Sequence, residues 1–175
     1  MKSTGILADR ALILQFLKRV NRRAVAIESL LAGSLVLTVF VVVLLQVVMR
    51  YLFQRPNPWS EELSRFGFIW LSMLGAALAV ELRTHFVFDQ LVGRLRPKLQ
   101  MLVRICSTAF VVALAVGLIV FGLDLVVLAS SQRSPALNLP ISWVYASVPV
   151  AGLLMLLHIT AALDTVLGRE VEDQR

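Results

Sequence analysis

The sequence contains few of the residues from which catalytic and metal sites are usually built. It has two histidines in 175 residues and a single cysteine, Cys106, so no disulfide can form within the chain. It also lacks the short motifs of phosphate-binding loops, dinucleotide-binding folds, zinc proteases and serine hydrolases. We therefore predict that the protein is not an enzyme and binds no metal or cofactor.

Charged residues are scarce as well. They make up 16% of the chain, whereas hydrophobic residues make up 58% and the mean hydropathy is +0.82. Such a composition is too apolar for a water-soluble core with a polar coat, so it predicts that the lipid bilayer is the solvent. Four stretches contain no Asp, Glu, Lys or Arg, namely residues 29–49, 66–80, 105–123 and 139–163.

The lengths of these stretches predict the fold class. At a rise of ~1.5 Å per residue, three of them can cross a hydrocarbon layer of ~30 Å as α-helices. The second can do so if its helix begins near Pro58. The predicted fold is therefore an all-α integral membrane protein with four transmembrane helices. We place these spans at about residues 24–50, 58–82, 98–128 and 140–164.

The distribution of basic residues predicts the orientation of the chain. Thirteen of the seventeen Lys and Arg residues fall before the first span, between the second and third, or after the fourth. Short loops rich in Lys and Arg stay on the cytoplasmic side, so both termini are predicted to be cytoplasmic. The same distribution accounts for the net charge of +6 without a nucleic-acid partner.

Residues 1–23 are predicted to form a separate cytoplasmic segment. Its apolar side chains recur at helical spacing opposite basic ones, at Ile13, Phe16, Leu17 and Val20. This pattern favours a short amphipathic helix that lies on membrane lipid at the inner surface. Residues 24–168 then form the membrane domain, and residues 169–175 form a cytoplasmic tail.

Small residues at four-residue spacing predict the packing faces of the spans, because helices in lipid associate where their backbones approach closely. The second span offers Gly75 and Ala79, and the fourth offers Ser147 and Ala151. The spacing does not distinguish packing within this chain from packing against another subunit. Pro149 lies within the fourth span and predicts a kink there.

Two adjacent acids, Glu61 and Glu62, stand at the start of the second span. Pro58 suits the first position of a helix, acids suit its first turn, and Arg65 lies four residues after Glu61. The acids could therefore start a helix and form a surface ion pair, or they could dock a partner outside the cytoplasm. Both interpretations remain open. Ion coupling is disfavoured because it needs a carboxylate at membrane depth.

Three further ionisable residues have several possible roles. Glu28 can reach the inner headgroups, which favours structural or interfacial pairing. His85, expected in the loop after the second span, and His158, late in the fourth, could ligate a haem between helices. Ordinary polar contacts at the inner interface are the alternative for both histidines.

Four short motifs, taken in order, resemble one family. They are WSEELSR at residues 59–65, GAALA at 75–79, RTHFVFD at 83–89 and SPALNLPISWVY at 134–145, which runs into PVAGLLML. With the four spans and their orientation, they resemble the small membrane subunit (DctQ-like) of tripartite ATP-independent periplasmic (TRAP) transporters. The resemblance covers roughly residues 20–168.

The resemblance implies a multi-pass protein of the bacterial inner membrane that serves sodium-coupled import of organic acids. A periplasmic solute-binding protein would deliver the substrate to a large polytopic membrane subunit, which holds the sodium and substrate sites. The small subunit would be a four-helix scaffold beside it. Two other classes remain from the residues alone: a stand-alone four-helix exporter and a haem-binding membrane anchor.

The polar motifs of the family can be carried over residue by residue. The acidic motif falls on Glu61 and Glu62, and the His/Asp motif falls on His85 and Asp89. Thr84 departs from the glycine of the family, so the tight turn there is not implied. We expect the acidic pair to order the outer end of the second span against the large subunit. The candidate interface or structural residues are Trp59, Glu61, Glu62, Arg65, Gly75, Ala79, His85 and Asp89.

Overall fold

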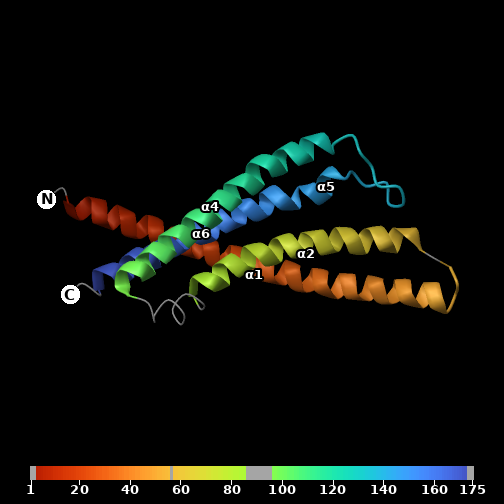
Figure 1. The fold of residues 1–175 in the computed structure, drawn as a ribbon, viewed down its shortest axis with the longest axis horizontal. Helices are drawn as coiled ribbons and strands as arrows, with labels where there is room; N and C mark the ends of the chain where they lie inside the picture. Colours follow the sequence, from red (N-terminus) through yellow and green to blue (C-terminus); the bar gives the residue numbers. More distant parts are fainter. Residues whose placement is uncertain (1–2, 56, 86–95, 173–175) are drawn as a thin grey trace.

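The computed structural model of the protein describes residues 3–55, 57–85 and 96–172. Its helices are α1 (Ser3–Tyr51), α2 (Pro58–His85), α4 (Pro97–Leu128), α5 (Ser142–Tyr145) and α6 (Ser147–Glu172), as Figure 1 shows. Four stretches are long and apolar enough to cross a membrane, namely Gln15–Tyr51, Pro58–Leu82, Leu99–Leu128 and Ser142–Ala162. The predicted all-α fold with four transmembrane helices is confirmed.

Helix α1 is much longer than a bilayer is thick. Its 49 residues correspond to about 73 Å at the usual rise, more than twice a hydrocarbon layer of ~30 Å. The basic N-terminal segment is not a separate short helix, because α1 continues without a break through residue 23. Its position on the membrane surface stays a prediction.

Helix α2 begins at the predicted residue. Pro58 has no N–H to satisfy, and the N–H and the hydroxyl of Ser60 both donate to the carbonyl of Asn57, at 3.2 and 2.7 Å. Farther along, α1 and α2 approach each other closely at Gly67, where a Cβ atom would lie 2.8 Å from Cγ2 of Val39. These contacts fix the α1/α2 hairpin.

Helices α4 and α6 cross at two glycines that the predicted small-residue seams did not include. A Cβ atom on Gly152 would lie 2.7 Å from the carbonyl oxygen of Ala115, and one on Gly122 would lie 2.8 Å from Cδ of Pro149. Ser147 of the predicted seam is buried on α6, as is Ala151. The crossing therefore places backbone against backbone, as is usual for helices packed in lipid.

The fourth span is interrupted near its start. Helix α5 ends at Tyr145 and α6 begins at Ser147, with Ala146 between them. Pro149 lacks an N–H, so the carbonyl of Tyr145 has no helical partner four residues later. The distortion predicted from Pro149 thus occurs one turn before it.

Helix α6 is the centre of the molecule. It packs against α1, α2 and α4, whereas among the described residues α1 and α4 do not touch. Half of its spanning window is buried, and Ala77, Ala115 and Met155 form the apolar core around it. The fold is therefore two hairpins, α1/α2 and α4/α6, joined along α6.

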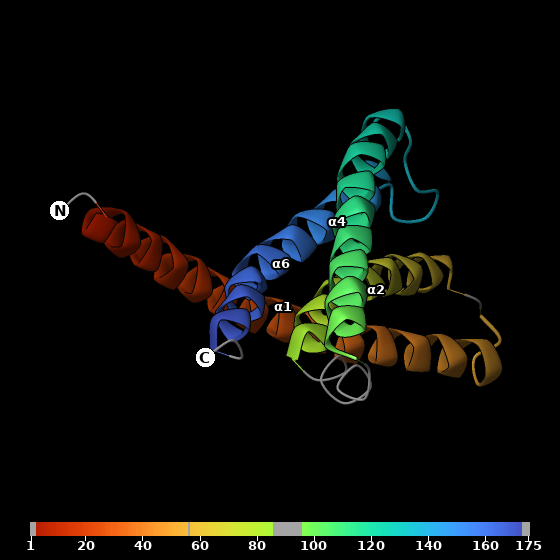
Figure 2. The same cartoon turned by 60° about the vertical axis from the view of Figure 1, so that its left-hand side comes forward.

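The two hairpins cross near one end and diverge toward the other (Figures 1 and 2). We call the end with the connections 52–57 and 129–141 the loop end, and the opposite end, where α6 finishes, the terminal end. The start of α1 and the end of α6 both lie on the terminal side, as the predicted topology requires. The assignment of that side to the cytoplasm stays a prediction.

Candidate functional site

Two buried polar contacts hold the hairpins together, one toward each end of the molecule, and an exposed hydrogen bond, from the indole N–H of Trp70 on α2 to the carbonyl of Trp143 on α5 at 3.2 Å, also links them. The first, which we call the loop contact, joins Glu62 of α2 to the loop between α4 and α5. The second, which we call the histidine cluster, joins Asn21, Glu28, Glu81 and His158. Buried polar groups in a membrane protein are costly unless they are partnered, so both contacts are candidates for functional importance.

The loop contact is built by the two oxygens of one carboxylate. Oε1 of Glu62 accepts a hydrogen bond from the N–H of Ala136, and Oε2 accepts one from the N–H of Leu137, each at 3.0 Å. Glu62 is 7% exposed. Hydrogen bonds to an ionised carboxylate are stronger than neutral ones, so this side chain fixes the loop against α2.

The loop itself is shaped to present these two donors. Ser134 is buried, and its hydroxyl and carbonyl oxygens accept hydrogen bonds from the N–H groups of Leu139 and Asn138, at 3.2 and 3.0 Å. Asn138 has φ 55°, in the left-handed region that asparagine tolerates. The guanidinium of Arg133 donates to the carbonyl of Asn138 at 3.1 Å. The turn is therefore held at both ends.

The two adjacent acids have different environments. Glu61 is exposed and pairs with Arg65 at 3.1 Å, which confirms the predicted ion pair at i, i+4. Glu62 points into the molecule instead and accepts its hydrogen bonds from the loop of the same chain. Because neighbouring residues on a helix point about 100° apart, only one of the two can face the loop. Whether Glu61 meets another subunit is not decided by these contacts.

The other predicted residues lie in several places. Trp59 is partly exposed at the loop end, beside a shallow groove that Glu62 also lines. Gly75 is exposed and Ala79 half-buried on α2, and a Cβ atom on Gly75 would meet nothing within 4 Å. His85 is the last residue of α2, so its predicted place in a loop is wrong. Its side chain, and Asp89 altogether, lie outside the described residues.

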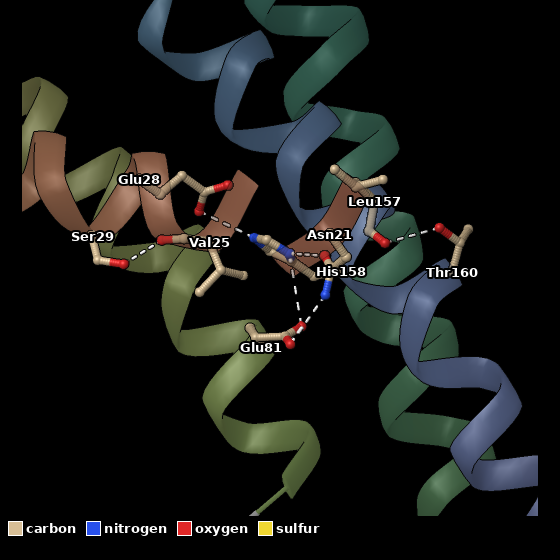
Figure 3. Close-up of polar contacts among 8 residues, drawn as sticks. All are labelled: Asn21, Val25, Glu28, Ser29, Glu81, Leu157, His158 and Thr160. Carbon is tan, nitrogen blue, oxygen red and sulfur yellow. Dashed lines mark hydrogen bonds and ion pairs between the residues drawn. The ribbon is translucent and has the colours of Figure 1, made fainter. Parts of the chain in front are cut away.

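The histidine cluster brings together three helices (Figure 3). Asn21 and Glu28 lie seven residues apart on α1, Glu81 lies on α2, and His158 lies on α6. Nδ1 of His158 is 2.7 Å from Oδ1 of Asn21, and Nε2 is 3.1 Å from Oε2 of Glu28. The amide of Asn21 also donates to Oε1 of Glu81 at 3.1 Å. Each helix therefore supplies a polar group to one shared network.

The cluster is deeply enclosed. His158 is 0% exposed and Glu28 is 3% exposed. The predicted pairing of Glu28 is therefore a structural one, made inside the molecule with the histidine of α6. Both ring nitrogens of His158 have partners, so a haem could be ligated by this residue only if these contacts were broken. Among the described side chains, no group of three or more potential ligands is arranged for a metal ion.

The sequence contained a weak signal for this cluster. Asn21 and Glu28 stand two helical turns apart and so share one face, and His158 interrupts the apolar run before Ala162. Neither feature indicates the partner helix, because His158 lies 130 or more positions from both Asn21 and Glu28. Considered one residue at a time, the sequence therefore did not predict that these polar side chains form one hydrogen-bonded network.

Comparison with known proteins identifies the family to which this four-helix chain belongs. The family model of the DctQ component of tripartite ATP-independent periplasmic transporters matches residues 39–167. The chain belongs to this family. As a DctQ-family protein with four spans, it is a small permease subunit of a TRAP transporter and a multi-pass protein of the bacterial inner membrane. The matched range includes the loop contact, Glu81 and His158, whereas Asn21 and Glu28 precede it.

Individual relatives agree with this assignment. The sialic acid TRAP transporter small permease protein SiaQ of Vibrio cholerae is 29% identical over 139 residues, 74% of this DctQ-family chain and 75% of SiaQ. A TRAP transporter small permease protein of Haemophilus influenzae is 31% identical over 139 residues, 79% of this chain and 86% of the relative.

Two other relatives are much longer proteins. The sialic acid permease protein SiaT of Haemophilus influenzae is 28% identical over 144 residues, 78% of this chain and 22% of SiaT. The isethionate permease protein DctMQ of Oleidesulfovibrio alaskensis is 34% identical over 122 residues, 63% of this chain and 19% of DctMQ. The chain thus matches about a fifth of each of these proteins.

Proposed function

We propose that this DctQ-family subunit is the scaffold of a sodium-coupled secondary transporter that imports an organic acid. The observation that carries the proposal is the size of SiaT and DctMQ, in which the matching region is about a fifth of one larger permease. The remainder of such a permease corresponds to a large polytopic membrane subunit, which we take to be the partner of this chain. A periplasmic solute-binding protein would deliver the substrate to the pair.

The structure supports a scaffold role over a substrate-carrying role. The described polar side chains that are buried bond to other groups of this chain, as at Glu62 and His158. The depressions beside Glu61 and beside Trp59 are shallow and open. Transporter sites are commonly built from helices broken at mid-membrane, whereas the break at Ala146 lies at the loop end. We therefore place the sodium and substrate sites in the large subunit.

The class of substrate is inferred from the relatives. Two are named for sialic acid and one for isethionate, and both compounds are organic anions. We extend this class, an organic acid, to the transporter that contains the present chain. The individual acid is a property of the large subunit and the binding protein.

We propose that the outward face of α2 meets the large subunit. Ser72, Gly75 and Ala76 are exposed there, and Glu61 and Arg65 continue the same face at the loop end. The exposed surface of α1, in contrast to that of α2, consists mainly of bulky Leu, Val and Phe side chains, which are suited to contact with lipid. Small residues allow a second helix to approach closely, which favours the α2 face as the interface.

Replacement of Gly75 by leucine is expected to separate assembly from folding. A side chain at this position meets nothing in the isolated chain, so the melting temperature of the purified subunit should be unchanged. Co-purification of the large subunit in mild detergent should fall at least about tenfold, which corresponds to ~1.4 kcal/mol of association free energy. The matched control is Val41→Leu on the exposed surface of α1.

Three outcomes would contradict parts of this proposal. Equal recovery of the large subunit with Gly75→Leu and with the control would assign the α2 face to lipid. Recovery of the chain only as a homodimer would support a stand-alone exporter instead. A Soret band in the purified protein would support a haem-binding anchor, whereas a colourless preparation would discard that alternative.

A further inference from the structure

We propose that three arginines on the outer side of α1, Arg19, Arg22 and Arg23, form a binding site for the headgroup of an anionic phospholipid. We call these residues the arginine band. The lipid would belong to the leaflet at the terminal end of the molecule. The inference concerns this chain alone and does not depend on the proposed substrate or partner.

The arginine band occupies one face of α1. Its members stand three and four residues apart, the spacing of neighbours on a helix surface. Arg19 and Asn21 differ by about 200° of rotation, so the band lies opposite the side from which Asn21 and Glu28 reach His158 (Figure 3). All three arginines are exposed, whereas Asn21 and Glu28 are buried. The packing of α1 against α6 therefore turns the arginine band outward.

The arginine band has no acidic partner within the described part of the chain. Glu28 and Glu81 contact His158, and Glu61 pairs with Arg65. None of these ion pairs includes an arginine of the band. Guanidinium groups that lie close together repel one another, and an anion in contact with several of them removes this repulsion. The planar guanidinium also suits the oxygens of a phosphate group, which it can bind through two hydrogen bonds.

The surface that follows the band on the same side of α1 is apolar. Ile27 and Leu30, four and seven residues after Arg23, are 58% and 75% exposed. Between Arg23 and Arg50 the sequence has one charged residue, Glu28, which is buried on the other side. This stretch measures about 40 Å at the usual rise, enough to cross a hydrocarbon layer of ~30 Å with some tilt. The arginine band therefore lies where the hydrocarbon ends and the phosphate groups begin.

The two surfaces together match a phospholipid better than a soluble phosphate. A lipid can place its acyl chains beside Ile27 and Leu30 while its phosphate group meets the arginines. Charge then selects among phospholipids. A zwitterionic headgroup carries an ammonium group that the arginines repel, whereas an anionic headgroup does not. Each basic residue near an anionic membrane surface strengthens binding by about fivefold, so the three arginines together give about 100-fold.

The test is native mass spectrometry of the full chain in detergent, titrated with phosphatidylglycerol and, separately, with phosphatidylcholine. We expect the parent to bind phosphatidylglycerol at least about tenfold more tightly than phosphatidylcholine. The triple variant Arg19→Gln, Arg22→Gln, Arg23→Gln should bind phosphatidylglycerol about 100-fold more weakly than the parent and phosphatidylcholine equally well. Equal binding of phosphatidylglycerol by the parent and this variant would overturn the proposal.

Two controls separate the site from a general effect of charge. Replacement of the same three residues by lysine keeps the positive charge and should retain most of the binding. Arg50→Gln removes a single exposed arginine at the other end of α1 and should have little effect, whereas Arg19→Gln alone should weaken binding about fivefold. If Arg50→Gln and Arg19→Gln weaken binding equally, the lipid is attracted by net charge and the arginine band is not a site.

A second measurement distinguishes a lipid site from a contact with another molecule. In phosphatidylcholine nanodiscs the triple glutamine variant should keep the melting temperature of the parent, because the replaced side chains are exposed. Phosphatidylglycerol should raise the melting temperature of the parent but not that of the variant. Displacement of the lipid by inorganic phosphate would assign the band to a soluble anion. Unchanged lipid binding with lost co-purification of the large subunit would assign it to a protein interface. Either result would overturn the proposal.

Discussion

Replacement of Gly152 by alanine is expected to force α4 away from α6 and to lower the free energy of unfolding by about 2 kcal/mol, a typical cost of overpacking a tight interface. The new Cβ atom would lie 2.7 Å from the carbonyl oxygen of Ala115 and 2.8 Å from Cγ1 of Ile119. The first of these is a backbone atom, and Ala115 is fully buried. Relief of the clash therefore requires a shift of the whole helix.

The effect can be measured by reversible unfolding in bicelles, with Gly75→Ala as the matched control. The control adds the same methyl group at a position in α2 where nothing lies within 4 Å, so its unfolding free energy should not fall and can rise by up to about 1 kcal/mol, the usual advantage of alanine over glycine in a helix. If both variants are destabilised equally, the cost comes from the loss of glycine itself and not from the crossing of α4 and α6.

Replacement of Glu62 by glutamine is expected to release the loop between α4 and α5. One of the two N–H groups, of Ala136 or Leu137, would then face the amide NH₂ of the new side chain instead of a carboxylate oxygen. Ala136 is exposed and Leu137 half-buried, but both donate to a charged group. Loss of such a hydrogen bond costs about 1.5–3 kcal/mol, so hydrogen exchange of these two amides should accelerate by about 10–100-fold.

Hydrogen exchange followed by mass spectrometry of peptides over residues 130–140 gives the measurement. Glu61→Gln is the natural control, because it removes one charge from the adjacent position but touches only the exposed pair with Arg65. Its effect on the loop should be close to zero, since exposed ion pairs contribute little. Slow exchange in both variants would mean that Ser134 and Asn138 hold the turn without help from Glu62.

The neighbouring acids show where prediction from sequence reaches its limit. The Glu61–Arg65 pair could be predicted because both partners lie on one helix, four residues apart. The role of Glu62 could not, because its two donors lie 74 and 75 positions later in the chain. Which of two adjacent side chains faces inward depends on the rotation of α2 about its own axis. That rotation is set by packing against α1 and α6.

The small residues show the same limit. Spacing predicted Gly75 as part of a packing seam and did not single out Gly152, yet within this chain Gly75 faces open space and Gly152 lies against the backbone of α4. Likewise, Asn21 and Glu28 share a face of α1, but only the crossing of α1 with α6 brings them to His158. The sequence therefore predicted polar contacts for His158 but could not identify their partners.

The sequence by itself determined the number of spans, the start of α2 at Pro58 and the resemblance to the DctQ-like family, because these depend on the length of apolar runs and on the order of short motifs. Only the tertiary structure decided which polar residues are buried together. Helices in a bilayer can rotate and cross without changing their hydrophobic length, so apolar patterning leaves the choice of partners open. That choice is made by the close backbone contacts at Gly67, Gly122 and Gly152.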